Sequence, residues 1–307
     1  ALPIFEKGIA ELVREFIDAG RPSSREQNID DRRRGYLAST VLAGEQEKRV
    51  QVEDIELDGM TFRVVSPLNA SGALPAVIYF HGGCFISGDF ATHDHQLRQL
   101  AYHSGCRVIA MQYRLAPEHT FPAAHDDAER GALIIHRRAE QLGIDASRIT
   151  LAGDSAGGHL ALVTALRLKT AQAWQPAQLV LIYPMLDATA SMKSYIDNGK
   201  DYIITEDTLL SGYEMYLSAT ALHHPEASPL WRKDFHGLPP VHILTAEYDP
   251  LRDEGEALYQ RLLEQGVDCT CQRYLGVIHG FFQLGGISPA AGSAMRDIAW
   301  RVKTPGR

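Results

Sequence analysis

Cysteines are scarce in this chain, and none of them forms a recognisable redox or metal-binding motif. Of the 307 residues only four are cysteine, and no C-x-x-C pattern occurs among Cys84, Cys106, Cys269 and Cys271. Cys269 and Cys271 lie two residues apart in a strand-like stretch, and we expect no disulfide between them. The sequence therefore predicts reduced cysteines and a cytoplasmic location rather than a disulfide-stabilised secreted domain.

Long apolar runs and an excess of positive charge are also missing. No run approaches the roughly 20 apolar residues that a membrane-spanning helix needs. Residues 1–16 carry charges throughout and lack the basic start, apolar middle and small-residue exit of a signal peptide. The formal net charge of −8 argues against a nucleic-acid-binding surface. We therefore expect no membrane and no nucleic acid among the partners of this chain.

What the chain does contain is a regular alternation of short apolar runs and helical patterns. A hairpin is predicted from Val50–Leu57, the turn Asp58-Gly59 and Met60–Val65. Farther along, buried strands alternate with helices, which is typical of a mostly parallel sheet with helices on both faces. The predicted strands are Pro75–Phe80, Cys106–Gln112, Ile149–Ala152, Gln178–Tyr183, Val241–Ala246 and Cys269–Leu275. We interpret residues 1–307 as a single α/β domain.

The alternation breaks between about residues 187 and 236. This stretch has a helix start at Thr205-Glu206-Asp207 and helical apolar spacing after it, but no strand of the βα kind. We interpret it as a helical cap above the edge where open α/β sheets bind ligands. Near the N-terminus, one predicted helix stops at Gly20 and a second is expected over about Ser24–Leu42. The charge run Asp30–Arg34 is interpreted as a solvated helix face with local ion pairs.

One pentapeptide, Gly153-Asp154-Ser155-Ala156-Gly157, lies between a predicted buried strand and a predicted helix. A strand, a G-x-S-x-G turn and a helix are what a nucleophile elbow needs. The turn would hold Ser155 in a strained backbone conformation, and side chains at Gly153 and Gly157 would collide. The sequence therefore predicts that the Ser155 hydroxyl projects from the top of the sheet as a nucleophile.

A serine hydroxyl needs a base to take its proton and an acid to orient that base. In hydrolases with this elbow the acid and the histidine follow the serine in that order, each in a loop after a strand. Asp249 follows the strand Val241–Ala246, and His279 follows the strand Cys269–Leu275. Asp249 could also be only the N-cap of the next helix. The competing carboxylates are Glu247, Asp253 and Glu254.

The other histidines are given structural or surface interpretations. His159 lies one helical turn after Ser155, so its side chain is expected to pack beneath the elbow and not to face the hydroxyl. Two further histidine pairs lack a third ligand at suitable spacing, and we expect them on the surface without a metal. These pairs are His93-x-His95 and His223-His224.

The tetrahedral intermediate of acyl transfer needs hydrogen-bond donors for its oxyanion. The N–H of Ala156, directly after the nucleophile, is one expected donor. The others are expected from His81-Gly82-Gly83, where a strand ends and the absence of side chains lets the backbone approach a substrate. A double glycine after a strand is also compatible with an ordinary tight turn.

Taken together, these motifs resemble the hormone-sensitive-lipase-like family of α/β-hydrolases, also called bacterial family IV esterases, and most resemble its bacterial acetyl-esterase group. The resemblance runs in order over nearly the whole chain. It rests on His81-Gly82-Gly83-Cys84, Tyr113-Arg114-Leu115-Ala116-Pro117-Glu118, Gly153-Asp154-Ser155-Ala156-Gly157-Gly158, Asp249-Pro250-Leu251-Arg252-Asp253-Glu254 and His279-Gly280-Phe281.

The resemblance implies a catalytic function for these residues. It implies Ser155 as nucleophile, Asp249 as acid and His279 as base. Oxyanion donors are implied at Gly82, Gly83 and Ala156. It also adds residues from about 1 to 45 to the cap and makes a homodimer through the last strand plausible. The chain departs from the family at Cys84, where a third glycine is usual, and this puts in doubt the room beside the oxyanion hole.

The predicted activity is hydrolysis of short-chain acyl esters by a serine carboxylesterase, without a cofactor. Large side chains of the predicted cap are expected to close an apolar pocket over Ser155 and limit the acyl chain. They are Phe5, Phe16, Tyr202, Tyr213, Tyr216 and Trp231. Two alternatives are compatible with the same residues, namely an amidase or deacetylase with the same triad and a non-catalytic binding protein on this fold.

Overall fold

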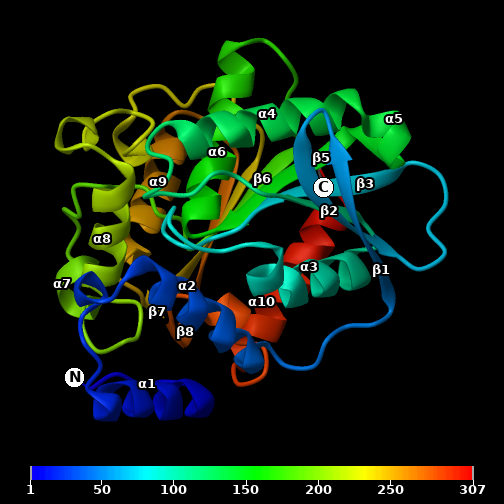
Figure 1. The fold of residues 1–307 in the computed structure, drawn as a ribbon. Coiled ribbons are helices and arrows are strands. Elements are labelled where there is room, and N and C mark those ends of the chain that lie inside the picture. Colours follow the sequence, from blue (N-terminus) through cyan, green and yellow to red (C-terminus); the bar gives the residue numbers. More distant parts are fainter. Residues whose placement is uncertain (1, 306–307) are drawn as a thin grey trace.

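The computed structural model describes residues 2–305, and an eight-stranded sheet runs through its centre (Figure 1). The strand order is β1-β2-β4-β3-β5-β6-β7-β8. The pairs β1–β2 and β2–β4 are antiparallel, and the remaining pairs are parallel. The strands are β1 (Val50–Leu57), β2 (Met60–Pro67), β3 (Leu74–Phe80), β4 (Arg107–Met111), β5 (Ile144–Asp154), β6 (Gln178–Ile182), β7 (Val241–Tyr248) and β8 (Cys269–Ile278). The predicted mostly parallel sheet is confirmed.

Consecutive side chains of the central strands enter two different cores, as the two-residue period of a strand requires. On β3, Ala76, Ile78 and Phe80 belong to one core, whereas Val77 and Tyr79 belong to the other. β3 is apolar along its whole length because both of its faces are covered.

Helices cover both faces of the sheet. On one side lie α4 (Ala123–Arg137), α5 (Ala139–Leu142), α6 (Ala156–Thr170) and α9 (Arg252–Glu264). The other side is covered by α3 (Phe90–Ser104) and α10 (Pro289–Lys303), which pack against each other (Figure 1). No helix within residues 2–305 is long and apolar enough to cross a membrane. All four cysteines are free thiols.

The remaining helices lie outside this sandwich and come from two distant parts of the chain. They are α1 (Lys7–Ala19), α2 (Ile29–Ala38), α7 (Ser194–Asn198) and α8 (Glu206–Tyr216). The predicted helix over about Ser24–Leu42 is divided, because 3₁₀ turns at Ser24–Glu26 and Ser39–Ala43 flank α2. The Ser23 hydroxyl donates to Asp207 at the start of α8 (2.8 Å), and the Arg25 guanidinium pairs with the same carboxylate. The segment before α2 is thereby attached to α8. Residue 1 of the predicted cap lies outside the described residues.

The interpretation of Asp30–Arg34 as a solvated face fits the exposed residues Asp30, Asp31 and Arg34, but Arg32 and Arg33 make tertiary contacts that correct it. Arg33 donates to the carbonyl oxygens of Ile86 (2.7 Å) and Ala116 (2.9 Å) and pairs with Glu118. Arg32 Nη1 donates to Ser211 Oγ on α8 (2.8 Å). Arg34 alone of the three arginines keeps a local pair within the run, with Asp31. Arg32 and Arg33 therefore connect α2 to α8 and to the neighbouring loops.

Candidate active site

The pentapeptide around Ser155 forms the predicted tight turn between β5 and α6. Ser155 has φ 56° and ψ −115°, a conformation that an L-residue adopts only under strain. A Cβ on Gly153 would lie 2.4 Å from the carbonyl carbon of Gly157, and a Cβ on Gly157 would lie 1.8 Å from the Phe80 oxygen. Both positions therefore require glycine, and the turn is as tight as the sequence predicted.

The side chains of His279 and Asp249 meet at this turn. His279 Nε2 lies 3.0 Å from Ser155 Oγ, and His279 Nδ1 lies 2.7 Å from Asp249 Oδ2. Asp249 directly follows β7, and β8 continues to Ile278, so His279 directly follows its strand as well. The second oxygen, Asp249 Oδ1, accepts the N–H of Leu251 (2.7 Å), which fixes the orientation of the carboxylate. The carboxyl ends of three parallel strands thus bring the three side chains into one hydrogen-bonded chain.

The carboxylates that competed with Asp249 are engaged elsewhere. Glu247 Oε1 accepts the N–H of Gly276 (2.9 Å), and Asp253 Oδ2 accepts the N–H of Ser194 (2.9 Å). Glu254 is completely buried and accepts the N–H of Asp187 (2.8 Å). Burial raises the pKa of Glu254 well above its ordinary value. These three carboxylates therefore bind backbone N–H groups, and Asp249 is the one among the four candidates that contacts His279.

His159 packs beneath the elbow as the sequence predicted. Its Nδ1 donates to the carbonyl oxygen of Met185 (2.8 Å), and its Nε2 lies 2.9 Å from His125 Nε2. Burial lowers the pKa of His159 to about 4, so the ring is neutral at physiological pH. Its ring nitrogens face away from Ser155, and His159 does not compete with His279.

The loop after β3 corrects one of the predicted oxyanion donors. The N–H of Gly82 points into the protein and donates to Asp154 Oδ1 (3.1 Å), so it is not free to bind an oxyanion. A Cβ on Gly82 would lie 2.4 Å from Asp154 Oδ2, and the close approach of this carboxylate therefore explains the glycine. Among residues 2–305, no acceptor faces the N–H groups of Gly83, Cys84 or Ala156.

His81 is buried, and its contacts with Tyr113 and Gly82 stabilise the start of this loop. Its ring stacks on Tyr113 with 4.2 Å between centroids, and its Nδ1 donates to the Gly82 carbonyl oxygen (2.7 Å). The Tyr113 hydroxyl in turn donates to the His81 carbonyl oxygen (2.6 Å). Burial lowers the pKa of His81 to about 4. A neutral, buried His81 is therefore a structural support of the loop.

His93 is not a surface residue, which corrects the prediction made for the His93-x-His95 pair. The side chain is 1% exposed, and its Nε2 lies 3.0 Å from Asp154 Oδ1. The Tyr79 hydroxyl donates to the same oxygen (2.7 Å). Burial opposes ionisation of Asp154, yet the His93 and Tyr79 contacts outweigh it and hold the pKa of Asp154 below its ordinary value.

A signal for the position of His93 was available in the sequence. Phe90, His93, Leu97 and Leu100 follow helical spacing and form the buried face of α3. His95 is half-buried, and His223 and His224 are exposed as predicted. No group of three or more histidine, cysteine or acidic side chains within residues 2–305 could hold a metal ion.

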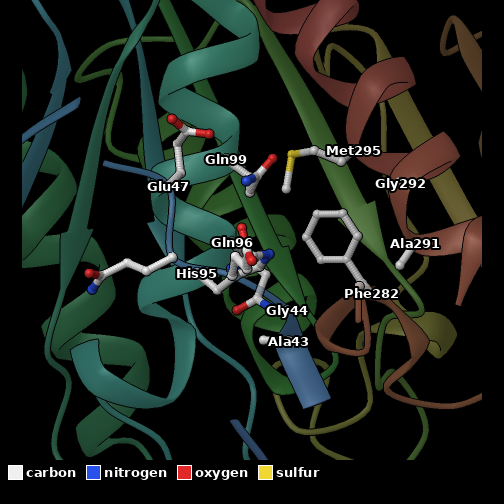
Figure 2. A pocket seen from close by; sticks show the side chains of 13 residues that line it. Ala43, Gly44, Glu47, His95, Gln96, Gln99, Phe282, Ala291, Gly292 and Met295 are labelled. Carbon is white, nitrogen blue, oxygen red and sulfur yellow. The ribbon is translucent and has the colours of Figure 1, made fainter. Parts of the chain in front are cut away.

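Two cavities lie away from Ser155. One, of about 340 Å³, opens between α3 and α10, with Gln96, Phe282 and Met295 among its walls (Figure 2). The other, of about 300 Å³, lies beside Arg33 and His81. Neither is lined by Ser155, Asp249 or His279. Ser155 itself is 4% exposed.

Comparisons with known proteins agree with this fold. A family model described as alpha/beta hydrolase fold matches residues 77–283. Ethyl acetate hydrolase of Pseudomonas putida is 34% identical over 288 residues, which cover 89% of this chain and 91% of that protein.

Two solved structures extend the likeness to nearly every residue. A thermostable esterase from Pseudomonas putida superposes with a TM-score of 0.95 at 30% identity, covering 100% of this chain and 99% of its own. An esterase from Pyrobaculum calidifontis superposes with a TM-score of 0.87 at 37% identity, covering 95% of this chain and 97% of its own. The chain therefore belongs to the alpha/beta hydrolase fold family, among its hormone-sensitive-lipase-like carboxylic ester hydrolases.

Proposed function

We propose that this carboxylic ester hydrolase cleaves short-chain acyl esters through an acyl-enzyme on Ser155. The observation that carries the proposal is the hydrogen-bonded chain from Ser155 Oγ through His279 to Asp249, with separations of 3.0 and 2.7 Å. A serine on a strained turn, a histidine within reach of its hydroxyl and a buried carboxylate behind the histidine are the parts that acyl transfer requires.

In the proposed first step, Ser155 Oγ attacks the ester carbonyl carbon while His279 Nε2 takes the hydroxyl proton. Asp249 accepts a hydrogen bond from the N–H of His279 Nδ1, which keeps Nε2 free as a base and stabilises the imidazolium that forms. The tetrahedral intermediate collapses as its bond to the alcohol oxygen breaks, and His279 returns the proton to that oxygen. In the second step, His279 activates a water molecule that attacks the acyl-enzyme, and the acid is released from Ser155.

The proposed oxyanion donors are the N–H groups of Gly83, Cys84 and Ala156, with Cys84 in place of the predicted Gly82. Their N–H groups have no acceptor within residues 2–305, which supports this choice. A side chain at position 84 does not remove a backbone donor. It packs toward α8, because a Cβ built on Gly212 would lie 2.7 Å from Cys84 Cβ. Burial raises the pKa of the Cys84 thiol to about 11, so this cysteine is a poor nucleophile.

We propose that residues from about 1 to 45 and from about 187 to 236 form a cap that limits the acyl chain, within one domain. Support comes from α8, whose Gly212 touches the loop of Cys84, and from α7, whose Ser194 hydroxyl donates to the Pro250 carbonyl oxygen (2.6 Å). Both loops border the proposed triad. The name of the Pseudomonas putida relative, ethyl acetate hydrolase, also favours a short acyl group.

Fewer aromatic side chains fit this limiting role than the sequence predicted. Trp231 is 45% exposed and lies over Arg261. The Tyr216 hydroxyl lies 2.8 Å from His125 Nδ1, so this side chain is engaged away from Ser155. Tyr213 is buried beside Phe85, near the loop that carries the proposed donors, and remains a candidate for this role.

Assembly and location are further proposals. β8 lies at the edge of the sheet and could pair with the same strand of a second copy, which would give a homodimer. Light scattering coupled to gel filtration tests this directly. The four free thiols favour a reducing compartment, in line with the predicted cytoplasmic location.

A series of p-nitrophenyl esters from two to sixteen carbons tests the proposed substrate class. We expect the highest kcat/KM between acetyl and butyryl esters. Each methylene that fits gains about 0.8 kcal/mol, but one that overpacks the pocket costs about 1–3 kcal/mol. A maximum at ten carbons or longer would show an open acyl channel. p-Nitroacetanilide, assayed in parallel, tests the amidase alternative, because faster cleavage of this amide than of the acetate ester would overturn the esterase assignment.

A further inference from the structure

We propose that Asp154 is a positioning residue that sets the oxyanion donors relative to the nucleophile. The proposal rests on the proposed roles of Ser155, Gly83 and Cys84. Asp154 directly precedes Ser155 in the chain, and Gly82 directly precedes Gly83. A hydrogen bond from Gly82 N–H to Asp154 Oδ1 (3.1 Å) therefore connects the backbone of the elbow to the backbone of the oxyanion loop.

The carboxylate that makes this connection is itself held from two other elements. Tyr79 on β3 donates its hydroxyl to Asp154 Oδ1 (2.7 Å), and His93 Nε2 on α3 lies 3.0 Å from Oδ1 and 3.2 Å from Oδ2. A carboxylate can only accept, so Nε2 of His93 carries a hydrogen. The Gly82 N–H is therefore assigned to Asp154, although it also lies 3.3 Å from His93 Nε2.

Burial makes this arrangement rigid. Asp154 and His93 are each 1% exposed, and water does not compete for their hydrogen bonds. In such surroundings charge-assisted hydrogen bonds are shorter and stronger than neutral ones. The carboxylate also lies against the Cα of Gly82, so the loop cannot move closer to β5. The hydrogen bond from Gly82 keeps the loop from moving away from the elbow, and the contact with the Asp154 carboxylate keeps it from moving closer.

Such precision matters because the donors act on charge that develops only in the transition state. Loss of one donor costs about a hundredfold to a thousandfold in kcat, and a misplacement of about 1 Å can cost about a hundredfold. If the Asp154–His93 pair only supported the fold, its loss would lower the free energy of unfolding. It would not specifically weaken the hydrogen bonds that the donors make to the oxyanion in the transition state.

The test uses Asp154→Asn, which keeps the side-chain shape but removes the charge and one acceptor. Thr150→Val is the matched control, since Thr150 is buried on the same strand and accepts a hydrogen bond from Gln178 (3.2 Å) far from the loop. Each protein is assayed with p-nitrophenyl acetate and its thionoester, whose sulfur is a weaker acceptor for the oxyanion donors.

For Asp154→Asn we expect kcat on the oxygen ester to fall roughly a hundredfold with KM changed less than about threefold. The rate on the thionoester should fall much less, so the ratio of the two rates drops. Thr150→Val should keep the wild-type ratio. An unchanged ratio, which includes an equal loss on both substrates, would overturn the positioning role. A change in KM alone would also overturn it.

A second variant keeps the test decisive if Asp154→Asn does not fold. Gly82→Ala would place a methyl group against Asp154 Oδ2, displace the loop and lower the same ratio. A wild-type ratio in Gly82→Ala would contradict the proposal. A fluorophosphonate separates this outcome from failure of the proposed function. If it does not label Ser155 in the wild type, the nucleophile is wrong, whereas labelled variants with an unchanged ratio refute only the role of Asp154.

Discussion

Two buried aspartate–histidine pairs lie on either side of Ser155, and they differ in what the histidine contacts. Asp249 and His279 are 2.7 Å apart, and the other nitrogen of His279 faces the Ser155 hydroxyl. Asp154 and His93 are 3.0 Å apart, and Nδ1 of His93 lies 2.8 Å from the hydroxyl of Thr92, away from any reacting atom. Residue type and burial are the same in both pairs. The two histidines therefore differ in the contact of the ring nitrogen that does not face the aspartate. That contact makes His279 a candidate base and His93 a structural residue.

The two pairs also differ in how they are assembled. Asp249 and His279 come from the ends of two adjacent parallel strands, and both lie in loops. Asp154 is the last residue of β5, and His93 belongs to the inner face of α3. A loop after a strand can present a side chain to a substrate, whereas His93 lies on the buried face of α3.

Removing the hydroxyl between the two pairs should have the largest effect. We expect Ser155→Ala to lower kcat by on the order of a millionfold, because neither aspartate–histidine pair contains another side chain that can form the acyl-enzyme. Both pairs should survive, and the melting temperature should stay close to wild type. Activity above about one hundredth of wild type would point to another nucleophile.

Breaking the Asp249–His279 pair should have the next largest effect. Asp249→Asn should lower kcat roughly ten-thousandfold, because the amide no longer holds His279 in the tautomer that can accept a proton. Glu247→Gln is the matched control, since Glu247 contacts the N–H of Gly276 and not the histidine. Steady-state kinetics of the two variants decide the assignment. If Glu247→Gln proves the more damaging, Asp249 is not the acid.

The smallest expected effect concerns a third buried carboxyl, Glu254, which has no histidine beside it. Its pKa is raised by burial, whereas the pKa of Asp154 is lowered despite burial. A raised pKa means that Glu254 contributes stability below its unfolded pKa of about 4.3 and that this contribution is lost as pH rises through the folded pKa. Glu254→Gln removes this loss and should therefore be more stable than wild type at pH 8.

Urea unfolding at pH 4, 6 and 8 measures the effect of Glu254→Gln. The advantage of the variant should grow by at most about 1.4 kcal/mol per pH unit above pH 4 and should shrink toward pH 4. A difference that does not depend on pH would mean that the pKa of Glu254 is the same in the folded and unfolded protein, which would contradict the raised pKa.

Much of the fold and the arrangement of the proposed triad followed from local patterns. Strands were identified by short apolar runs, and the elbow by two glycines whose Cβ atoms have no room. Ser155, Asp249 and His279 could be placed together because the carboxyl ends of parallel strands meet at one edge. These inferences need only chain order and the period of each element.

The contacts that escaped prediction depend on surfaces that meet only after folding. Arg33 looks like a solvated residue until α2 lies over the carbonyl groups of Ile86 and Ala116. Gly82 looks like an oxyanion donor until the Asp154 carboxylate is known to lie beneath it. His93 could have been predicted as buried from its helical spacing, but its partner on β5 could not.

A crystal structure of the enzyme inactivated by a short-chain phosphonate would show both the nucleophile and the groups that bind the oxyanion. We expect phosphorus bonded to Ser155 Oγ, with the phosphonyl oxygen within about 2.7–3.1 Å of the N–H nitrogens of Gly83, Cys84 and Ala156. In the same structure the Gly82 N–H should still donate to Asp154. Phosphorus on another side chain would contradict the role of Ser155, and a phosphonyl oxygen bound by the Gly82 N–H would contradict the proposed oxyanion donors.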